Sequence, residues 1–265
     1  MIRTKTLNNI ELLVADNIAV THGFTTRHSG VSPAPYDSLN LGPHRGDKDE
    51  NVAENRKRLA NALGFDLNKL VLTHQTHSDI VRVVNSGDCR GFDHHFYPES
   101  DAIITNEPGV ALWIFTADCT PILLWDSQTG AVGAVHAGWR GTASAIVAKT
   151  VKKMADSFGC DPKNIHAAIG PNIGFCCFET DADVPNAMLE SYGEAAKSFI
   201  RQQGQKYYVN LKELNALALR RVGVENIAIS DACTVCQCDR FWSHRVTKGI
   251  RGSQGAVIVC KEVSP

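Results

Sequence analysis

The stretch VALWIFTADCTPILLWDSQTGAVGAVHAGWRG, residues 110–141, decides the fold. Its three apolar runs, over 110–116, 121–125 and 131–136, are short and bounded by polar or glycine residues, so they predict strands. Asp118 and Cys119 follow the first run, and His136 ends the third. Each of these side chains interrupts an apolar stretch at a strand end, where a loop can present it to a cleft.

The rest of the chain predicts further strands and a smaller number of helices. The sequence KLVLTHQTHSDIVRVVN reads as two short strands around the polar turn 74–77. Strands often follow one another directly, which favours an α+β fold, and no sharp change of composition divides residues 1–265, so we expect one domain. Further strands are predicted at 19–26, 101–105, 166–170, 226–230 and 256–260. Helices are predicted at 49–63, near 183–192 and near 210–222. Another helix is predicted to be capped by Thr142 and to end at Gly159.

Composition limits the classes of partner and compartment. The chain has 265 residues, a formal net charge of −1 and 43% hydrophobic residues. That charge gives no strong attraction to nucleic acid or anionic lipid, and no apolar run approaches the roughly 20 residues that span a bilayer. The start lacks the apolar core and small-residue cleavage site of a signal peptide, so we expect a cytoplasmic protein whose nine cysteines are mostly reduced thiols.

Cys119, His136 and the histidines of the 74–77 turn are the main candidates for chemistry. A thiolate with two neutral imidazoles suits zinc or copper, and three such ligands leave a fourth position for water or substrate. The same residues also suit a Cys nucleophile activated by a His base. The residues alone do not decide between a metal site and a cysteine nucleophile.

Other polar residues give weaker indications. Cys233-x-x-Cys236-x-Cys238 is a compact spacing, but no second CxxC completes four ligands, so we interpret these thiols and Cys176–Cys177 as packing residues. The polar segment 27–50 predicts a functional loop. An anionic substrate would suit Arg140, next to the HAG motif, or Arg27 and Arg45 at the loop, whereas His94 and His95 read as surface residues.

Several motifs together closely resemble the laccase-domain family, over about residues 20–260. This family was long labelled multicopper polyphenol oxidase, and its members are now described as purine nucleoside phosphorylases with adenosine deaminase activity. The motifs are GFTTRHSGVSPAPYDSLNLGPHRGD, HQTHSDIV, ESDAIIT, TADCTPILLWD, AVHAGWRGT, AAIGPNIGFCCFE and CTVCQCDRFWSHR.

The resemblance implies a fold, a metal and a set of site residues. The fold is an α+β domain of packed mixed sheets with outer helices, similar to that of Cys-His deamidase toxins. The implied metal ligands are His77, Cys119 and His136, and the metal is zinc, although copper has been assigned within the family. Arg27, Asn40 and Arg140 correspond to candidates for binding substrate or phosphate. The chain departs from the family in having QTHS for QVHG and Gly252-Ser253 for Gly-Arg, where Arg251 is a candidate substitute.

The laccase label itself does not suit these residues. A blue multicopper oxidase needs repeated His-x-His pairs for about four coppers. This chain has ten histidines and no His-x-His. At most one metal ion is therefore expected at the Cys-His-His set.

The resulting hypothesis is a cytoplasmic, zinc-dependent enzyme that cleaves inosine, adenosine or methylthioadenosine with inorganic phosphate and also deaminates adenosine. Cys119, His136 and Asp118 are the expected catalytic residues, with Asp118 as a candidate acid for the leaving purine. Deamination would use a water activated at the open metal position. The alternatives are a Cys119–His136 hydrolase or amidase acting on a cell-wall precursor or another amide, a single-copper polyphenol oxidase, and a non-catalytic metal-binding module.

Overall fold

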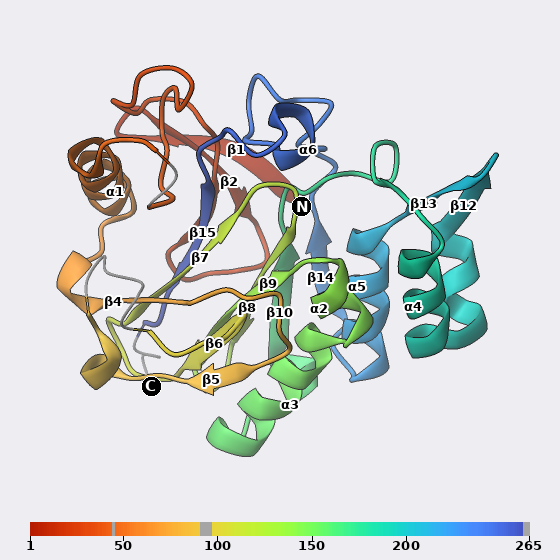
Figure 1. The fold of residues 1–265 in the computed structure, drawn as a ribbon. Coiled ribbons are helices and arrows are strands. Elements are labelled where there is room, and N and C mark those ends of the chain that lie inside the picture. The colour runs from red at the N-terminus through yellow and green to blue at the C-terminus, as the bar shows by residue number, and fades with distance from the viewer. Residues whose placement is uncertain (44–45, 91–96, 262–265) are drawn as a thin grey trace.

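Two six-stranded mixed sheets form the body of the protein (Figure 1). The computed structural model describes residues 1–43, 46–90 and 97–261. The first sheet has the order β1 (Ile2–Leu7), β2 (Ile10–Ala15), β3 (His22–Thr25), β15 (Gln254–Val259), β7 (Ala111–Thr116) and β4 (Leu70–Leu72). The second has the order β14 (Asn226–Ile229), β10 (Ile165–Ile169), β8 (Thr120–Asp126), β9 (Val132–Ala137), β6 (Ala102–Thr105) and β5 (Val81–Val83).

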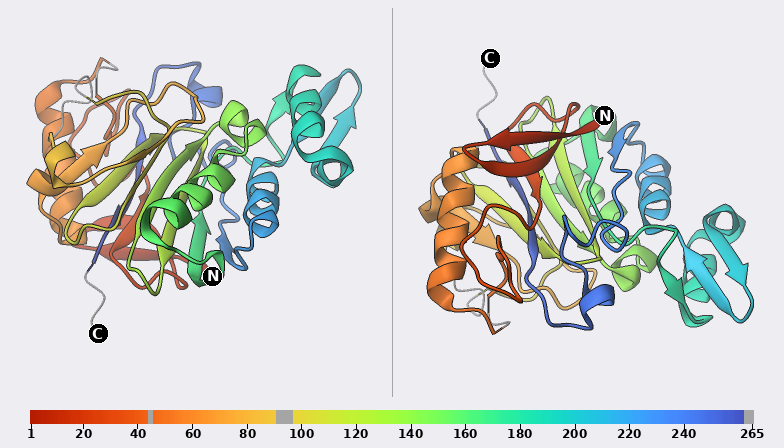
Figure 2. Two further views of the ribbon diagram at one scale, coloured as in Figure 1. Left: turned by 90° about the horizontal axis from the view of Figure 1, so that it is seen from below. Right: turned by 90° about the horizontal axis from the view of Figure 1, so that it is seen from above.

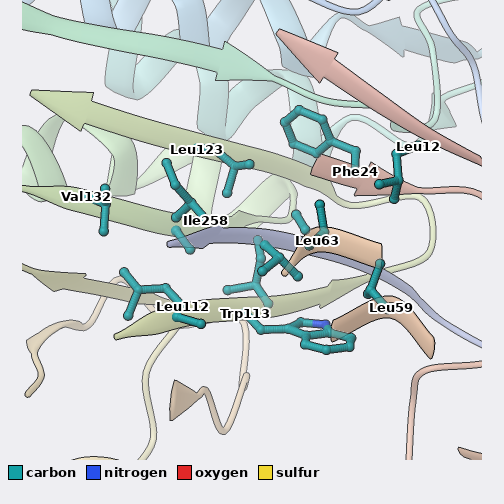
Figure 3. Close-up of a cluster of buried hydrophobic side chains, with 14 of the residues drawn as sticks. Leu12, Phe24, Leu59, Leu63, Leu112, Trp113, Leu123, Val132 and Ile258 are labelled. Atoms are coloured by element: carbon teal, nitrogen blue, oxygen red, sulfur yellow. The ribbon is translucent and has the colours of Figure 1, made fainter. Parts of the chain in front are cut away.

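The facing surfaces of the two sheets enclose one apolar cluster. Leu112 and Ile258 of the first sheet pack with Leu123 and Val132 of the second (Figure 3). Along β8 and β9 the alternate side chains, such as Ile122 and Val135, belong to a second cluster on the opposite face. This period of two is the ordinary consequence of strand geometry, and it makes β8 and β9 central strands that are buried on both faces.

Helices cover the outer face of the second sheet. Helices α3 (Ile146–Phe158) and α5 (Leu211–Arg221) contribute Val147, Val151 and Leu214 to the second cluster. On the other side of the molecule α1 (Asp49–Leu63) contributes Leu59 and Leu63 to the same cluster as Leu112 and Trp113 of β7 (Figure 3). The remaining α-helices are α2 (Trp139–Ala143), α4 (Asp183–Tyr192) and α6 (His244–Thr247).

A small lobe projects from the body beside the second sheet (Figure 2). It contains α4 and a three-stranded sheet of order β11 (Glu179–Thr180), β13 (Lys206–Val209) and β12 (Ile200–Gln203). Among the described residues, the 3-10 segments are Leu67–Lys69, Ser86–Asp88, Pro162–Asn164 and Gly193–Phe199. Within the described residues, no helix combines the length and the apolar character that crossing a membrane requires.

The predicted α+β class of packed mixed sheets with outer helices is confirmed. Helix α1 has the predicted bounds, and it ends where Gly64 adopts a left-handed φ of 73°. The three strands of the 110–141 stretch form as β7, β8 and β9. The assignment of residues 1–265 to one domain stays a prediction.

The predicted cap at Thr142 is wrong. Thr142 lies inside α2 and does not cap α3, because a left-handed Ala145 (φ 53°) separates the two helices. Its hydroxyl instead accepts a hydrogen bond from the Asn215 side chain at 2.9 Å. The hairpin of β1 and β2 was not predicted, although its turn residues Asn8 and Asn9 have the positive φ that a two-residue turn favours. Arg45, His94 and His95 lie outside the described residues.

Candidate metal centre and active site

Cys119 lies on the turn that carries the chain from the first sheet to the second. Strand β7 belongs to one sheet and β8 to the other, so residues 117–119 cross between them. Asp118 has a left-handed φ of 84°, a conformation that Asp tolerates better than most residues. Its carboxylate accepts hydrogen bonds from the Thr234 hydroxyl at 2.6 Å and the Arg245 backbone N–H at 2.7 Å. These contacts hold the turn and therefore the position of the Cys119 thiol.

His136 reaches the same place from β9. Alternate residues of a strand lie on the same face, so His136 shares the face of Val132 and Ala134, which face the cluster between the sheets. Its ring therefore points toward the first sheet. The ring is buried, and its Nδ1 lies 2.7 Å from Asp101 Oδ1. Because an ionised carboxylate only accepts, Nδ1 carries the proton, and Nε2 is the nitrogen available to a metal or a thiol.

His77 lies on a second segment that crosses between the sheets, from β4 to β5. Its φ of 62° is left-handed, a strained conformation that must be held by its surroundings. Asp101 holds it, because this carboxylate accepts the backbone N–H groups of Thr76, His77 and Ser78 at 3.2, 3.1 and 2.7 Å. Gln75 adds a second anchor through two hydrogen bonds to the backbone of Phe115, at 2.7 and 2.8 Å.

The three predicted ligands meet at one point. One donor atom each from His77, Cys119 and His136 lies within 4.8 Å of the other two. Cys119 Sγ is 3.7 Å from His77 Nε2, and the imidazole rings stand edge to face with centroids 5.0 Å apart. Sulfur and nitrogen ligands at this spacing, with a carboxylate behind one histidine, fit a tetrahedral metal ion with one open position. A His-Cys-His group able to hold a metal is therefore present.

Electrostatics in the metal-free site favour a charged pair. Burial raises the pKa of Cys119, but the charge of His136 and hydrogen bonds from His136 and His77 outweigh it and lower the pKa to about 6. Burial lowers the pKa of His136, but Cys119 and Asp101 together raise it to about 9. The thiol and imidazole therefore form a thiolate–imidazolium pair at neutral pH when no metal is bound.

The three ligands line a pocket of about 290 Å³. This volume is near the lower end of the roughly 300–1,000 Å³ of small-molecule sites. The walls come from the predicted functional loop, which contributes Gly42 and Pro43, from the 73–77 segment, and from the end of β7 with Phe115 and Thr116. Arg251 and Ser253, the two residues next to Gly252, complete the wall.

The other predicted site residues are not among the described residues that line this pocket. Asn40 is buried behind the wall, where its Oδ1 accepts the backbone N–H groups of Gly42 and Ser253 at 3.0 and 3.1 Å. Arg27 stacks on Trp242 at 4.0 Å and donates to backbone carbonyls. Arg140 is exposed on α2 and lies over Trp139. Both oxygens of Asp118 accept the hydrogen bonds described above.

Sequence reasoning missed the organising role of Asp101. Its side chain is fully buried and ties the His77 segment to His136. The available signal was an Asp directly before the buried strand AIIT, in a motif to which no role had been assigned. The sequence also did not indicate that Gly138 lies beside two of the candidate ligands. A Cβ at Gly138 would lie 2.8 Å from His77 Cδ2 and 3.3 Å from Cys119 Sγ, so this position has no room for a side chain beside two ligands.

Comparison with known proteins identifies the family of this chain. The family model described as multi-copper polyphenol oxidoreductase laccase matches residues 21–261. A protein of Deinococcus radiodurans named purine nucleoside phosphorylase is 40% identical over 253 residues, covering 96% of this chain and 94% of that protein. Purine nucleoside phosphorylase YlmD of Bacillus subtilis is 37% identical, covering 93% and 91%.

Solved structures share the whole architecture. YlmD from Geobacillus stearothermophilus superposes with a TM-score of 0.89 at 36% identity, covering 94% of each chain. Bacillus licheniformis protein YfiH gives 0.90 at 34% identity, covering 95% of this chain and 96% of that one. The chain belongs to the polyphenol oxidoreductase laccase family, and its relatives' names indicate a purine nucleoside phosphorylase-like enzyme.

Proposed function

We propose that the protein is a zinc-dependent purine nucleoside phosphorylase that acts in the cytoplasm on inosine, adenosine and methylthioadenosine. The observation that carries this proposal is the convergence of His77, Cys119 and His136 on a pocket that Arg251 also lines. Candidate metal ligands and an arginine lining one pocket suit a reaction that needs both an electrophile and an anion-binding group. Relatives named purine nucleoside phosphorylase supply the substrate class.

In the proposed reaction a phosphate oxygen attacks C1′ of the ribose, and the bond from C1′ to the purine nitrogen breaks. The purine leaves with the bonding electron pair and takes up a proton. Zinc held by His77, Cys119 and His136 would supply Lewis acidity toward the developing negative charge. Asp101 keeps His136 in one tautomer and holds the His77 segment, so the ligands need little reorganisation during the reaction. Asp118 was the candidate acid from the sequence, but both of its oxygens accept hydrogen bonds that hold the turn before Cys119. We therefore propose His74, which lines the pocket, as the proton donor in its place.

The test is phosphate-dependent release of free base from the zinc-loaded protein. We expect hypoxanthine and ribose 1-phosphate from inosine, with no base released when phosphate is omitted. Protein loaded with copper in place of zinc identifies the active metal. Zinc-replete protein that leaves inosine, adenosine and methylthioadenosine intact in phosphate buffer would disprove the proposal.

We further propose that the site deaminates adenosine. Water adds to C6 of the purine and ammonia leaves, so the product is inosine. The same pocket suits this reaction because three protein ligands leave one position open. Ammonia release from adenosine in the absence of phosphate measures this activity separately from phosphorolysis.

Arg251 is our candidate for binding phosphate. It is buried in the pocket wall, and its guanidinium is oriented by Gly252 O at 2.8 Å and Ser253 Oγ at 2.9 Å. Because a hydrogen bond to a charged group contributes about 1.5–3 kcal/mol, Arg251→Met is expected to raise the KM for phosphate about 10- to 100-fold. Arg251→Lys should recover part of this loss, because it keeps the charge.

Arg140→Met is the matched comparison, since Arg140 was one of the cations predicted from sequence and is not among the residues that line the pocket. We expect its KM for phosphate to stay within about twofold of the wild type. The opposite pattern, a raised KM in Arg140→Met with Arg251→Met unchanged, would assign phosphate binding to α2.

A second candidate function is favoured by one specific observation. Asp101, His136 and Cys119 form a carboxylate–imidazole–thiol series, with 2.7 Å between Asp101 Oδ1 and His136 Nδ1. This is the arrangement of a Cys-His hydrolase, in which the thiolate attacks a carbonyl carbon and the imidazolium protonates the leaving amine. The substrate would be an amide.

The pH dependence of Cys119 alkylation tests this candidate. In metal-free protein the depressed pKa of Cys119 makes the thiolate form above pH about 6, so the iodoacetamide rate should rise through that pH and level off by pH 8. Cys89 is the internal control, because burial and the nearby Glu107 and Asp88 raise its pKa and keep it a thiol at neutral pH. If the alkylation rate of Cys119 rises only near pH 9, the proposal of a Cys-His hydrolase is wrong.

A further inference from the structure

Four cysteines outside the pocket meet at one edge of the second sheet. Cys176 and Cys177 follow β10, and Cys233 and Cys236 follow β14. Strands β10 and β14 are a parallel pair, so their carboxyl ends lie side by side. A bridge between Asn172 and Cys233 and a 2.9 Å hydrogen bond from Thr234 N to Asn172 O tie the two segments together.

The spacing of the four sulfur atoms fits a single metal ion. All four lie within 4.8 Å of one another, with Cys236 Sγ at 3.5 Å from Cys176 Sγ and 3.4 Å from Cys177 Sγ. A tetrahedral zinc ion with Zn–S bonds of about 2.3 Å places its sulfur ligands about 3.8 Å apart, since a tetrahedron's edge is about 1.63 times the distance from centre to corner. The thiols are therefore already close to the arrangement that zinc requires.

The backbone around Cys233 also suits a metal thiolate. The N–H groups of Gly174, Val235 and Cys236 hydrogen-bond its sulfur, with the Gly174 nitrogen at 3.1 Å. Two of these donors come from the turn of the Cys233-x-x-Cys236 sequence itself. Backbone donors aimed at a sulfur stabilise negative charge there, as outer hydrogen bonds do for metal ligands.

The segment 174–177 brings two adjacent cysteines to the same side. A turn closes there, with hydrogen bonds from the Cys177 and Phe178 N–H groups to Gly174 O, both at 2.9 Å. A Cβ at Gly174 would lie 3.0 Å from Cys233 Cβ and 3.2 Å from Cys176 Sγ, so the thiols fill the space that a side chain would need. The interpretation of these cysteines as packing residues is therefore incomplete, because the fold supplies the second ligand pair that the sequence lacked.

We propose that Cys176, Cys177, Cys233 and Cys236 bind a second zinc ion, in a closed four-thiolate site with a structural role. Four thiolates with Zn²⁺ carry a net charge of −2, and the buried ammonium of Lys212 interacts electrostatically with Cys233 and Cys176. Lys212 is held there by Ser230 O at 2.6 Å and Ala232 O at 2.7 Å. Because four protein ligands leave no open position, this zinc binds no substrate.

The two cysteine segments also contact the turn that carries Cys119 of the first site. The Thr234 hydroxyl, inside the Cys233-x-x-Cys236 turn, donates to Asp118 Oδ1 at 2.6 Å. Ile173 N, just before the Cys176 turn, donates to Asp118 O at 2.9 Å. Both cysteine segments thus hold the residue next to Cys119. Losing the structural zinc is expected to lower the melting temperature and, through Asp118, to loosen the position of Cys119.

The test is the zinc content of purified full-length variants, by elemental mass spectrometry, after growth with zinc. We expect about two zinc ions per wild-type chain, about one in Cys233→Ser or Cys236→Ser, and about one in Cys119→Ala. Cys238→Ser is the matched control, since Cys238 completes the CxxCxC sequence but is not in the group of four thiols, and it should keep both ions. One ion in the wild type that is lost from Cys119→Ala and kept in Cys236→Ser would overturn the proposal.

A second measurement needs no variant and so does not depend on how variants fold. Wild-type protein is treated with iodoacetamide and its peptides are weighed, with and without prior removal of zinc by a chelator under reducing conditions. Zinc should protect Cys176, Cys177, Cys233 and Cys236, and chelation should expose at least the two solvent-exposed thiols, Cys176 and Cys236. Free reactivity of Cys176 and Cys236 in zinc-replete protein, or a disulfide from Cys236 to Cys176 or Cys177, would overturn the proposal. Neither readout depends on nucleoside cleavage.

Discussion

Replacing Cys119 with alanine is expected to lower phosphate-dependent cleavage of inosine by about 10³-fold or more and to remove one bound zinc ion. The thiol is the single sulfur ligand of the His77, Cys119 and His136 group. Without it two imidazoles remain, and Lewis acidity worth several kcal/mol of barrier is lost, where each 1.36 kcal/mol is a factor of ten. The measurements are kcat/KM for inosine at saturating phosphate and zinc content on the same samples.

Cys89→Ala is the control for Cys119→Ala, because Cys89 is a partly buried thiol in neither cysteine group. It should keep the zinc content and the activity of the wild type. The two effects of Cys119→Ala should also appear together. Cleavage that persists within tenfold of the wild-type rate after the zinc is lost would show that the reaction does not use this site.

Asp101→Asn is expected to lower kcat/KM by about 100-fold while every proposed metal ligand is still present. The carboxylate accepts five hydrogen bonds, from three backbone N–H groups, the Ser78 hydroxyl and His136 Nδ1. An asparagine NH₂ would face donors at either oxygen position, so His136 would lose its fixed tautomer and the strained His77 would lose its anchor. Removal of such partners typically costs 10- to 100-fold in metal affinity or activity.

The same substitution should destabilise the fold in a pH-dependent way. The substitution leaves several buried donors and His136 without their carboxylate partner. We expect this to lower the free energy of unfolding by about 3 kcal/mol, which corresponds to roughly 6–12 °C in melting temperature. Burial raises the pKa of Asp101, but its bonds to His136 and Ser78 outweigh this and hold the pKa below the usual 3.8. A carboxylate whose pKa is lowered in the folded state stabilises the fold at pH values above its unfolded pKa. The difference in free energy of unfolding between wild type and variant should therefore be complete at pH 7 and shrink as the pH falls below about 4.

Asp126→Asn separates the folding effect from the site effect of Asp101→Asn. Asp126 is another fully buried carboxylate, and its Oδ1 accepts the N–H groups of Gln128 and Thr129 at 2.8 Å in the turn after β8. We expect this control to lose stability and to keep its kcat/KM at temperatures where it is folded. Equal losses of kcat/KM in both variants would mean that Asp101 acts only through stability.

Individual elements could be predicted, and the candidate metal ligands proposed, because their signals are local or were carried by motifs. Helix α1 begins and ends as expected, since its apolar spacing and the left-handed Gly64 belong to the segment itself. Strands β7, β8 and β9 followed from their apolar runs. His77, Cys119 and His136 each lie at a strand end or in a turn, and family motifs identified His77 over His74.

What the sequence determined by itself was therefore the succession of buried strands and the polar turns between them, because strand and turn preferences act within a few residues. The choice of His77 within its turn came from the family motifs. The tertiary structure alone decided that the chain crosses between the sheets at both His77 and Cys119, that Asp101 holds the first ligand and His136, and that Cys176–Cys177 meets Cys233 and Cys236 about 60 positions later. These contacts depend on which strands pair, and pairing is set by the packing of two whole sheets, which no short segment contains.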